Sequence, residues 1–289
     1  MRIRAATALV ALLSLAACAK GQAPAALAPV AVGDLGWSCT SSAHQEALAR
    51  ELAAIDVSSL ATDGVTAAVS VHDDTGMNCS YQGDEELYAA STIKVVTATA
   101  VLSNAQEISE ETWDRIESAI ITSDNQAQQK LWEQAGGGQA MTDYMVSIGM
   151  DNSAAIPGDD GSGLAMVSAD DMALFWNSLS QGRLLDQERT RRVLGFASTV
   201  ADDQDWGIGA GTGKDDRVQL KNGWLDEATA DARIDPGTSP WMVNSTGHIS
   251  SGDDGWAIAV MTTGNKTHSA GIATVEEISM AVNQVLLDR

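Results

Sequence analysis

Basic residues are scarce in this chain of 289 residues. It carries 17 Lys and Arg against 39 Asp and Glu, which gives a formal net charge of −22. Phosphate backbones and anionic lipid surfaces would repel such a chain. We therefore exclude nucleic acid as a partner, and we interpret the acidic surface as an aid to solubility.

Patterns that bind metals or phosphates are also missing. The histidines are scattered without paired ligand spacing, at His44, His72, His248 and His268. The acidic clusters at residues 202–205 and 253–254 do not match a calcium loop. The glycine-rich GIGAGTGK at residues 207–214 precedes a predicted strand and does not open a helix, so it is not a phosphate loop. We expect no metal and no cofactor.

Long hydrophobic runs are absent apart from a short one at the N-terminus. MRIRAATALVALLSLAAC has a basic start, an apolar run too short to span a bilayer, and small residues before Cys18. Its end, LAAC, resembles the bacterial lipobox, so residues 1–17 are predicted to be a lipoprotein signal peptide and Cys18 the lipidated residue. The alternative is a plain signal peptide cut nearby. Residues 18–40, rich in Ala and Pro, are predicted to be a flexible tether.

This leader predicts an exported protein, attached to a membrane only by a lipid on Cys18. Its place would be the outer face of the bacterial cytoplasmic membrane or the cell envelope. Outside the cytoplasm, the two cysteines that remain after Cys18, Cys39 and Cys79, are expected to form a disulfide. Two buried free thiols are the alternative.

The periodicity along residues 41–289 predicts strands at both ends of a helical middle. A helix is expected over residues 41–55, with Ser42 as its cap, and a hairpin over residues 65–81. Helices follow at residues 112–121, 125–135, 138–148 and 168–179, and then three strands and a C-terminal helix. We expect an α+β fold, an α/β/α sandwich with one five-stranded antiparallel sheet, flanked by helices and carrying an inserted all-helical subdomain. The sheet subdomain would comprise residues 41–90 and 206–289, and the helical subdomain residues 91–205.

Three short motifs carry the chemistry. STIK at residues 91–94 places a serine and a lysine one turn apart on a helix, where they are neighbours. SDN follows at residues 123–125, and KNG lies in a predicted strand at residues 221–223. In this order the three resemble the S-x-x-K, S-D-N and K-T-G motifs of penicillin-recognising serine enzymes.

The sequence around the motifs resembles class A β-lactamases in particular. The stretch from VSVHDDTG to STIKVVTATAVL, residues 69–102, is similar to the first strand through the nucleophile helix of that family. AIITSDNQAQQKLWEQAGGG at residues 119–138 and AAIPGDD at residues 154–160 resemble later segments. The resemblance covers residues 41–289 and implies a catalytic domain with the β-lactamase/transpeptidase-like fold.

The resemblance implies a role for each motif residue. Ser91 would be the nucleophile that forms an acyl-enzyme, and Lys94 would take its proton if the amine is neutral. Ser123 would pass a proton to the leaving nitrogen. Three further residues complete the expected site: Asn125, Lys221 and Gly223 would bind substrate. The N–H groups of Ser91 and Trp224 would form the oxyanion hole.

Three departures from the family pattern bear on function. The second motif follows Ser91 by only 32 residues, where the family usually has about 60. Asn222 replaces a hydroxyl residue, and Trp224 is bulkier than the small residue usual there; it would narrow the cleft, form a stacking wall or merely cover the sheet edge. No glutamate occurs between Glu133 and Glu188, so the omega-loop glutamate that activates the deacylating water is missing. Asp159 and Asp160 are not expected to replace it.

These features predict a monomeric serine hydrolase of class A type that acts on β-lactam amide bonds with slow deacylation. Its partner would be a β-lactam or a peptidoglycan-like small substrate. A D,D-peptidase or esterase of the same superfamily is the first alternative. A non-hydrolytic ligand-binding lipoprotein of the envelope is the second.

Overall fold

The computed structural model describes residues 28–30, 35–61, 64–156, 158, 163–230 and 240–289. Cys18, the predicted signal peptide, Asp159 and Asp160 lie outside these residues. Among the described residues, no helix is long and apolar enough to cross a membrane.

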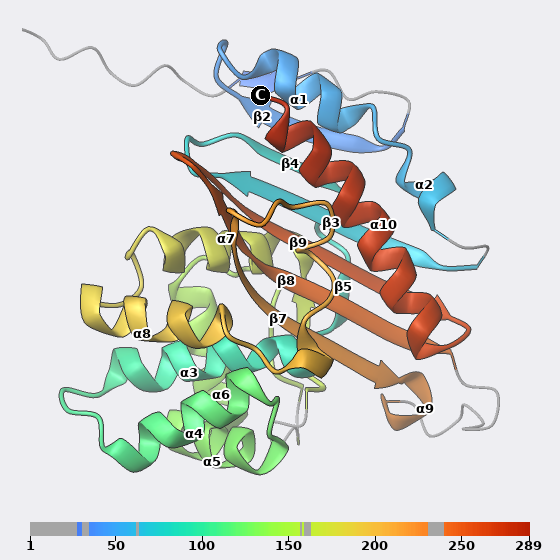
Figure 1. Ribbon diagram of the computed structural model, residues 1–289. Coiled ribbons are helices and arrows are strands. Elements are labelled where there is room, and N and C mark those ends of the chain that lie inside the picture. Colours follow the sequence, from blue (N-terminus) through green and yellow to red (C-terminus); the bar gives the residue numbers. More distant parts are fainter. Residues whose placement is uncertain (1–27, 31–34, 62–63, 157, 159–162, 231–239) are drawn as a thin grey trace, which may run out of the picture.

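One antiparallel sheet forms the centre of the molecule, in the strand order β1-β2-β4-β3-β9-β8-β7. Its strands are β1 (Ala28–Val30), β2 (Trp37–Ser41), β3 (Thr66–Asp73), β4 (Asn78–Tyr81), β7 (Arg217–Asp226), β8 (Trp241–Ser251) and β9 (Asp254–Asn265). Strand β3 pairs with β9, so the two ends of the described chain meet in one sheet, as predicted (Figure 1). The edge strand β7 carries the third motif.

The α+β fold class is confirmed, but the number of strands is wrong: the sheet has seven strands, where five were predicted. The two extra strands, β1 and β2, come from the segment predicted to be a tether. Trp37 on β2 is fully buried, and its Nε1 donates to the carbonyl of Ile55 at 2.9 Å. The folded domain therefore begins before residue 41.

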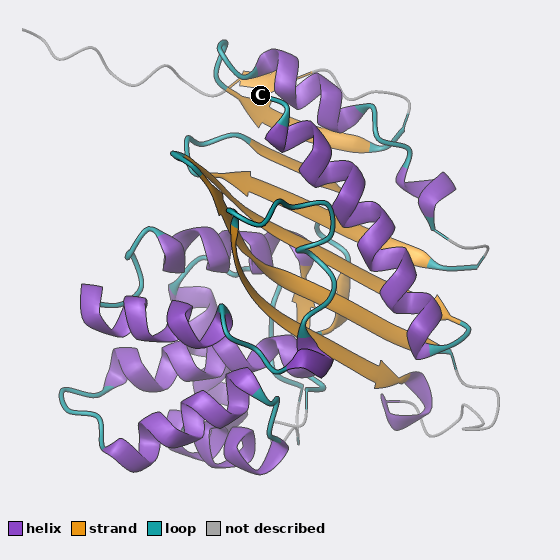
Figure 2. Cartoon of the chain, in the orientation of Figure 1, coloured by secondary structure: helices purple, strands orange, loops and turns teal. Residues whose placement is uncertain are grey.

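Helices cover both faces of the sheet (Figure 2). On one face lie α1 (Glu46–Ala53), α2 (Val57–Leu60) and α10 (His268–Leu287). On the other face are α3 (Ile93–Asn104), α4 (Glu110–Ile121), α5 (Asn125–Ala135), α6 (Gly137–Ser147), α7 (Ala169–Ser180) and α8 (Gln187–Ala197). The short elements are β5 (Glu86–Tyr88) paired with β6 (Met166–Ser168), η1 (Ala90–Thr92), η2 (Asp202–Gln204) and α9 (Glu227–Ala230).

The helical segment is not a wholly separate subdomain. It contains β6, and α7 packs directly on β3, β8 and β9. Helix α7 begins as predicted after Ser168, whose hydroxyl accepts from the Asp171 N–H at 3.1 Å. Helix α1 is shorter than predicted, because Ser41 pairs in β2. Ser42 does not cap it: Gln45 precedes its first residue, and the Ser42 hydroxyl donates to the Gln45 side chain.

Helix α3 is buried on all sides. Every residue from 93 to 102 is buried, which is typical of a helix in the middle of a domain. Lys94 is the one charged residue in that buried stretch. A buried amine is stable only where other groups accept its hydrogen bonds. The groups that do so for Lys94 define the candidate site.

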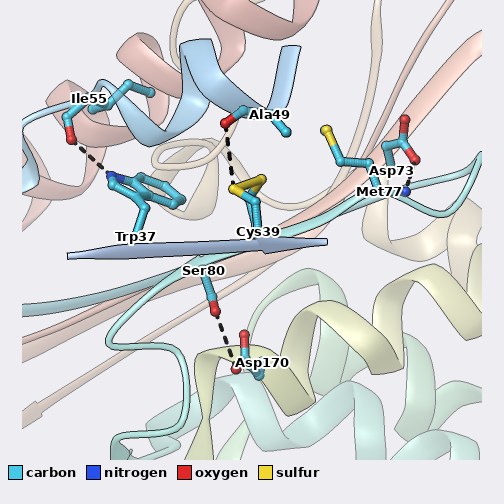
Figure 3. Close-up of a disulfide and its surroundings, with 9 residues drawn as sticks. Trp37, Cys39, Ala49, Ile55, Asp73, Met77, Ser80 and Asp170 are labelled. Carbon is cyan, nitrogen blue, oxygen red and sulfur yellow. Dashed lines mark hydrogen bonds between the residues drawn. A yellow bond between two sulfur atoms is a disulfide. The ribbon is translucent and has the colours of Figure 1, made fainter. Parts of the chain in front are cut away.

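A disulfide joins Cys39 and Cys79, which stand directly opposite each other on β2 and β4. Figure 3 shows Trp37 and Cys39 on the α1 side of β2, while Ser80 points the other way toward Asp170 of α7. The bridge therefore ties the added N-terminal strands to the rest of the sheet.

Candidate active site

Ser91 lies in the 3-10 turn η1, directly before α3. The residue before it, Ala90, has φ 48°, a strained backbone for a residue other than glycine. Two contacts hold this turn: the Ala90 N–H donates to the Gly163 carbonyl at 2.9 Å, and the Thr92 hydroxyl donates to the Ala89 carbonyl at 2.7 Å. Ser91 is thus fixed at the N-terminal end of a buried helix, where backbone dipoles favour negative charge.

Lys94 joins the first motif to the second. Its side chain is buried, with the residue 2% exposed. The Nζ atom lies 2.5 Å from the Ser123 carbonyl oxygen, 3.0 Å from the Ser123 Oγ and 2.7 Å from the Asn125 Oδ1. Ser123 adopts φ 57° and thereby turns both its carbonyl and its hydroxyl toward the amine.

The same amine makes no hydrogen bond to Ser91 within the described part of the chain. We expected the amine and the Ser91 hydroxyl to be in near contact, and the resting structure instead directs the amine at Ser123 and Asn125. Hydrogen bonds to catalytic bases are often long before substrate binds.

Two buried lysines face this site, and each has a lowered pKa. Burial lowers the pKa of Lys94 to about 8, although the carboxylate of Asp124 opposes the shift. Burial, together with the positive charge of Lys94, holds the pKa of Lys221 well below its ordinary value, and Asp203 opposes this. A neutral amine is therefore within reach at moderately alkaline pH, which a general base requires.

The third motif touches η1, the turn that contains Ser91, through Gly223. A Cβ built on Gly223 would lie 2.6 Å from the Ser91 backbone nitrogen and 2.8 Å from that of Thr92. Only glycine fits this contact between β7 and η1. Since β7 is an edge strand, alternate N–H groups of β7 have no partner strand. The Lys221 Nζ donates to the Asn222 carbonyl at 2.8 Å.

The side chain of Asn222 faces away from Lys221. It is buried, and its Nδ2 donates to the carbonyls of Gln204 at 2.7 Å and Trp206 at 2.9 Å. Side chains alternate along a strand, so Asn222 and Trp224 lie on the α10 side of the sheet. Asn222 therefore anchors the segment before β7 and takes no place in the cleft.

Trp224 belongs to an aromatic cluster on that same side. Its ring centroid lies 4.8 Å from that of His268 and 6.0 Å from that of Trp206. Trp241 contacts His268 as well, at 5.7 Å. Of the three roles considered from sequence, the contacts favour coverage of the sheet edge.

The loop between α6 and α7 reaches the site at Gly163, whose carbonyl accepts from Ala90. A carboxylate on α7, that of Asp171, serves structure: it accepts from the Asn152 N–H at 2.8 Å and from the Ser153 hydroxyl at 2.6 Å. Burial raises the pKa of Asp171 against these hydrogen bonds. The carboxylate of Asp171 is therefore engaged in holding the segment after α6 and is not free to act as a deacylating base.

His248, a possible further carboxylate contact from the sequence, has another partner. Its Nε2 lies 3.0 and 3.2 Å from the two carboxylate oxygens of Asp74. The pair joins β8 to the turn after β3. His248 is therefore engaged in holding the sheet together.

The structure thus brings together Lys94 with Ser123 and Asn125, and Gly223 with Ser91. Lys221 is coupled to Lys94 through their charges. The sequence did not predict the Ala90–Gly163 contact, nor that the Asn222 side chain lies on the α10 side of the sheet. Strand alternation from Lys221 could have revealed the second. Among the described residues, no group of three or more His, Cys, Asp or Glu could hold a metal ion.

Comparisons with known proteins agree with this arrangement. The model of the beta-lactamase enzyme family, Beta-lactamase2, matches residues 47–109 and 109–286. No functionally curated protein gives a significant match to the sequence.

Solved structures with the same fold include three of interest. A mutant of PBP-A, solved as an acyl-enzyme complex with penicillin G, has a TM-score of 0.67 and 19% identity over 84% of this chain and 97% of that one. A class A β-lactamase from Bacteroides cellulosilyticus has a TM-score of 0.70 and 16% identity over 84% and 99%. An ancestral class A β-lactamase has a TM-score of 0.64 and 23% identity over 82% and 99%.

Proposed function

We propose that this chain, which belongs to the beta-lactamase enzyme family, acts as a serine hydrolase of class A type, forms an acyl-enzyme on Ser91 from β-lactam amide bonds and releases it slowly. The observation that carries this proposal is the position of the Lys94 amine, buried between Ser123 and Asn125 beside a nucleophile turn that Gly223 contacts.

Acylation follows from these residues. The neutral Lys94 amine accepts the Ser91 proton as the Ser91 Oγ bonds to the lactam carbonyl carbon. The carbonyl oxygen gains negative charge, which the N–H groups of Ser91 and Trp224 stabilise. When the C–N bond breaks, the Ser123 hydroxyl gives its proton to the leaving nitrogen and regains one from Lys94. Lys221 attracts the substrate carboxylate, and Asn125 holds the amide on the acyl side.

Among the residues that the structure describes, no comparable arrangement supports deacylation. Water must attack the ester carbonyl, and a positioned general base typically contributes about 10²–10⁴-fold to such a step. The chain has no glutamate between Glu133 and Glu188, and the carboxylate of Asp171 on α7 is hydrogen-bonded to Asn152 and Ser153. We therefore expect the acyl-enzyme to accumulate.

A D,D-peptidase or esterase is the second candidate. The missing glutamate favours it, because that residue serves hydrolysis of the acyl-enzyme and not its formation. A ligand-binding envelope lipoprotein without turnover is the third. All three candidate functions begin with acylation or ligand binding at the same cleft. They differ in whether, and how fast, the bound group is then released.

We place this activity outside the cytoplasm, on a monomer anchored by a lipid on Cys18. The Cys39–Cys79 disulfide supports export, since disulfides persist in oxidising compartments.

A fluorescent penicillin tests the proposal. The purified domain and a Ser91→Ala variant are incubated with the reporter, and the intact mass is followed over time. An adduct on the wild type that persists for many minutes supports slow release, whereas a transient one shows an efficient hydrolase. An adduct of equal yield on both proteins, or none on either, refutes Ser91 acylation by β-lactams.

A further inference from the structure

A second hollow lies apart from the candidate active site, between the C-terminal end of α7, helix α8 and the beginning of β7. Its volume is about 720 Å³, within the range of ligand pockets. Ser91, Lys94, Ser123 and Lys221 do not line it. We call it the α8 groove.

Gln219 lines this groove from β7. It is 5% exposed, and its Oε1 is enclosed without a hydrogen-bond partner among the described residues. It precedes Lys221 by two positions on the same strand, so its side chain lies on the same face of the sheet. Buried polar atoms in folded proteins are nearly always hydrogen-bonded. The Gln219 amide oxygen is thus a polar atom without a partner beside this hollow. A rotation of the side chain toward the groove lets it accept a hydrogen bond from a ligand.

Two arginines line the groove as well, Arg191 on α8 and Arg217 on β7. Neither makes an ion pair or a hydrogen bond through its side chain to any residue that the structure describes. Their neighbours on α8 behave differently: Arg189 pairs with Asp186, and Arg192 with Glu110. In a chain with 39 acidic residues against 17 basic ones, two unpaired guanidinium groups around one hollow are available to an anion.

From these groups we infer that the α8 groove binds a small organic anion that carries a carboxylate or phosphate group and an N–H or O–H donor. The guanidinium groups of Arg191 and Arg217 match carboxylate or phosphate oxygens, because their N–H donors form a planar fork. When the Gln219 side chain rotates toward the groove, its Oε1 accepts the ligand's donor. The inference is independent of the acyl chemistry, since no residue of the candidate active site takes part.

The test is isothermal titration of the full domain with three probes. N-acetyl-L-glutamate supplies carboxylates and an N–H, glucose 6-phosphate supplies a phosphate and hydroxyls, and N-acetyl-L-glutamine methylamide is neutral. We expect at least one anion to bind with a Kd below about 1 mM and the neutral probe to bind at least tenfold more weakly. The anion that binds identifies the ligand class.

Variants locate the site. Arg191→Gln/Arg217→Gln should weaken binding at least tenfold, whereas Lys266→Gln, which removes an exposed charge before α10, and Ser91→Ala should leave it unchanged. Gln219→Met should weaken binding while the Tm stays equal or rises, because the unpaired oxygen is removed. The inference is overturned if neither anion binds, if the neutral probe binds equally, if the double variant binds like the wild type, or if Gln219→Met lowers the Tm and leaves binding intact.

Discussion

At the scale of single residues, the proposed chemistry depends on Lys94. A lysine that is 2% exposed on the most buried helix would be costly unless its amine were needed and its donors satisfied. Here the Ser123 and Asn125 oxygens satisfy it, and burial brings its pKa to about 8. The residue can therefore change protonation state in a moderately alkaline range.

We expect the rate of acylation to rise with pH in consequence. Below pH 8 the amine is mainly protonated and cannot accept the Ser91 proton. The acylation rate should increase about tenfold per pH unit toward pH 8 and then level off, since the neutral fraction follows the pKa of about 8. Stopped-flow acylation by a chromogenic penicillin from pH 5.5 to pH 9.5 measures this. A flat profile would show that Lys94 is not the base.

Gly223 is a second residue whose substitution is expected to change the acylation rate. Gly223→Ala would force a Cβ to within 2.6 Å of the Ser91 nitrogen, so either β7 or the nucleophile turn must shift. A displacement near 1 Å can reduce a rate on the order of 10²-fold. We expect the acylation rate to fall by that order.

The matched control for this variant is Gly195→Ala on α8, where a Cβ meets nothing within 4 Å. Its acylation rate should equal that of the wild type. Equal rates for Gly223→Ala and wild type would mean that the contact between β7 and η1 does not position the nucleophile.

At the scale of elements, strand β7 serves two structures at once. Lys221 and Gln219 lie on the face of the sheet that α3–α8 cover. Asn222 and Trp224 lie on the opposite face, which α10 covers. The Asn222 amide fastens the segment around η2 to the strand through the Gln204 and Trp206 carbonyls. This explains why a long polar side chain stands where the family has a hydroxyl.

Asn222→Thr, which restores the family residue, should therefore destabilise the protein. A threonine is too short to donate to both carbonyls, and buried groups left unpaired cost about 1–3 kcal/mol. We expect chemical denaturation to show a loss in that range, with no increase in the acylation rate. A variant that is as stable as the wild type and acylates faster would place residue 222 in the cleft.

The Cys39–Cys79 disulfide holds strand β2 to strand β4. Cys39 and Cys79 are separated by 40 positions, and cross-linking a loop of that length stabilises a domain by about 2–4 kcal/mol. Cys39→Ala/Cys79→Ala should lower the free energy of unfolding by that amount. Because the bridge is remote from Ser91, the acylation rate at 25 °C should stay the same, and a large loss of rate with unchanged stability would contradict this assignment.

At the scale of the whole molecule, local patterns predicted the elements near the motifs well. Helix α5 was predicted with its observed bounds, because Asp124 caps it and Gly136 in the left-handed region ends it. Helix α8 was missed in a stretch dense in charged residues, and β1 was missed because its Ala- and Pro-rich surroundings resemble a linker. Strand β2 pairs with β4, and β1 pairs with β2, which no local pattern reveals.

The sequence predicted which residues form the candidate site, but it predicted their arrangement less well. The order of the three motifs indicates which side chains converge. It does not show that the Lys94 amine rests on Ser123 and Asn125, or that Asn222 faces α10, since both depend on the backbone angle at Ser123 and the register of β7.

In the proposed reaction a single side chain, the hydroxyl of Ser91, takes the acyl group. The most direct measurement is peptide mapping by mass spectrometry after reaction with a penicillin. We expect the acyl mass on the peptide that contains Ser91, and its loss in Ser91→Ala and Lys94→Met. An acyl group on any other peptide, or an undiminished adduct on Ser91 in Lys94→Met, would contradict the claim.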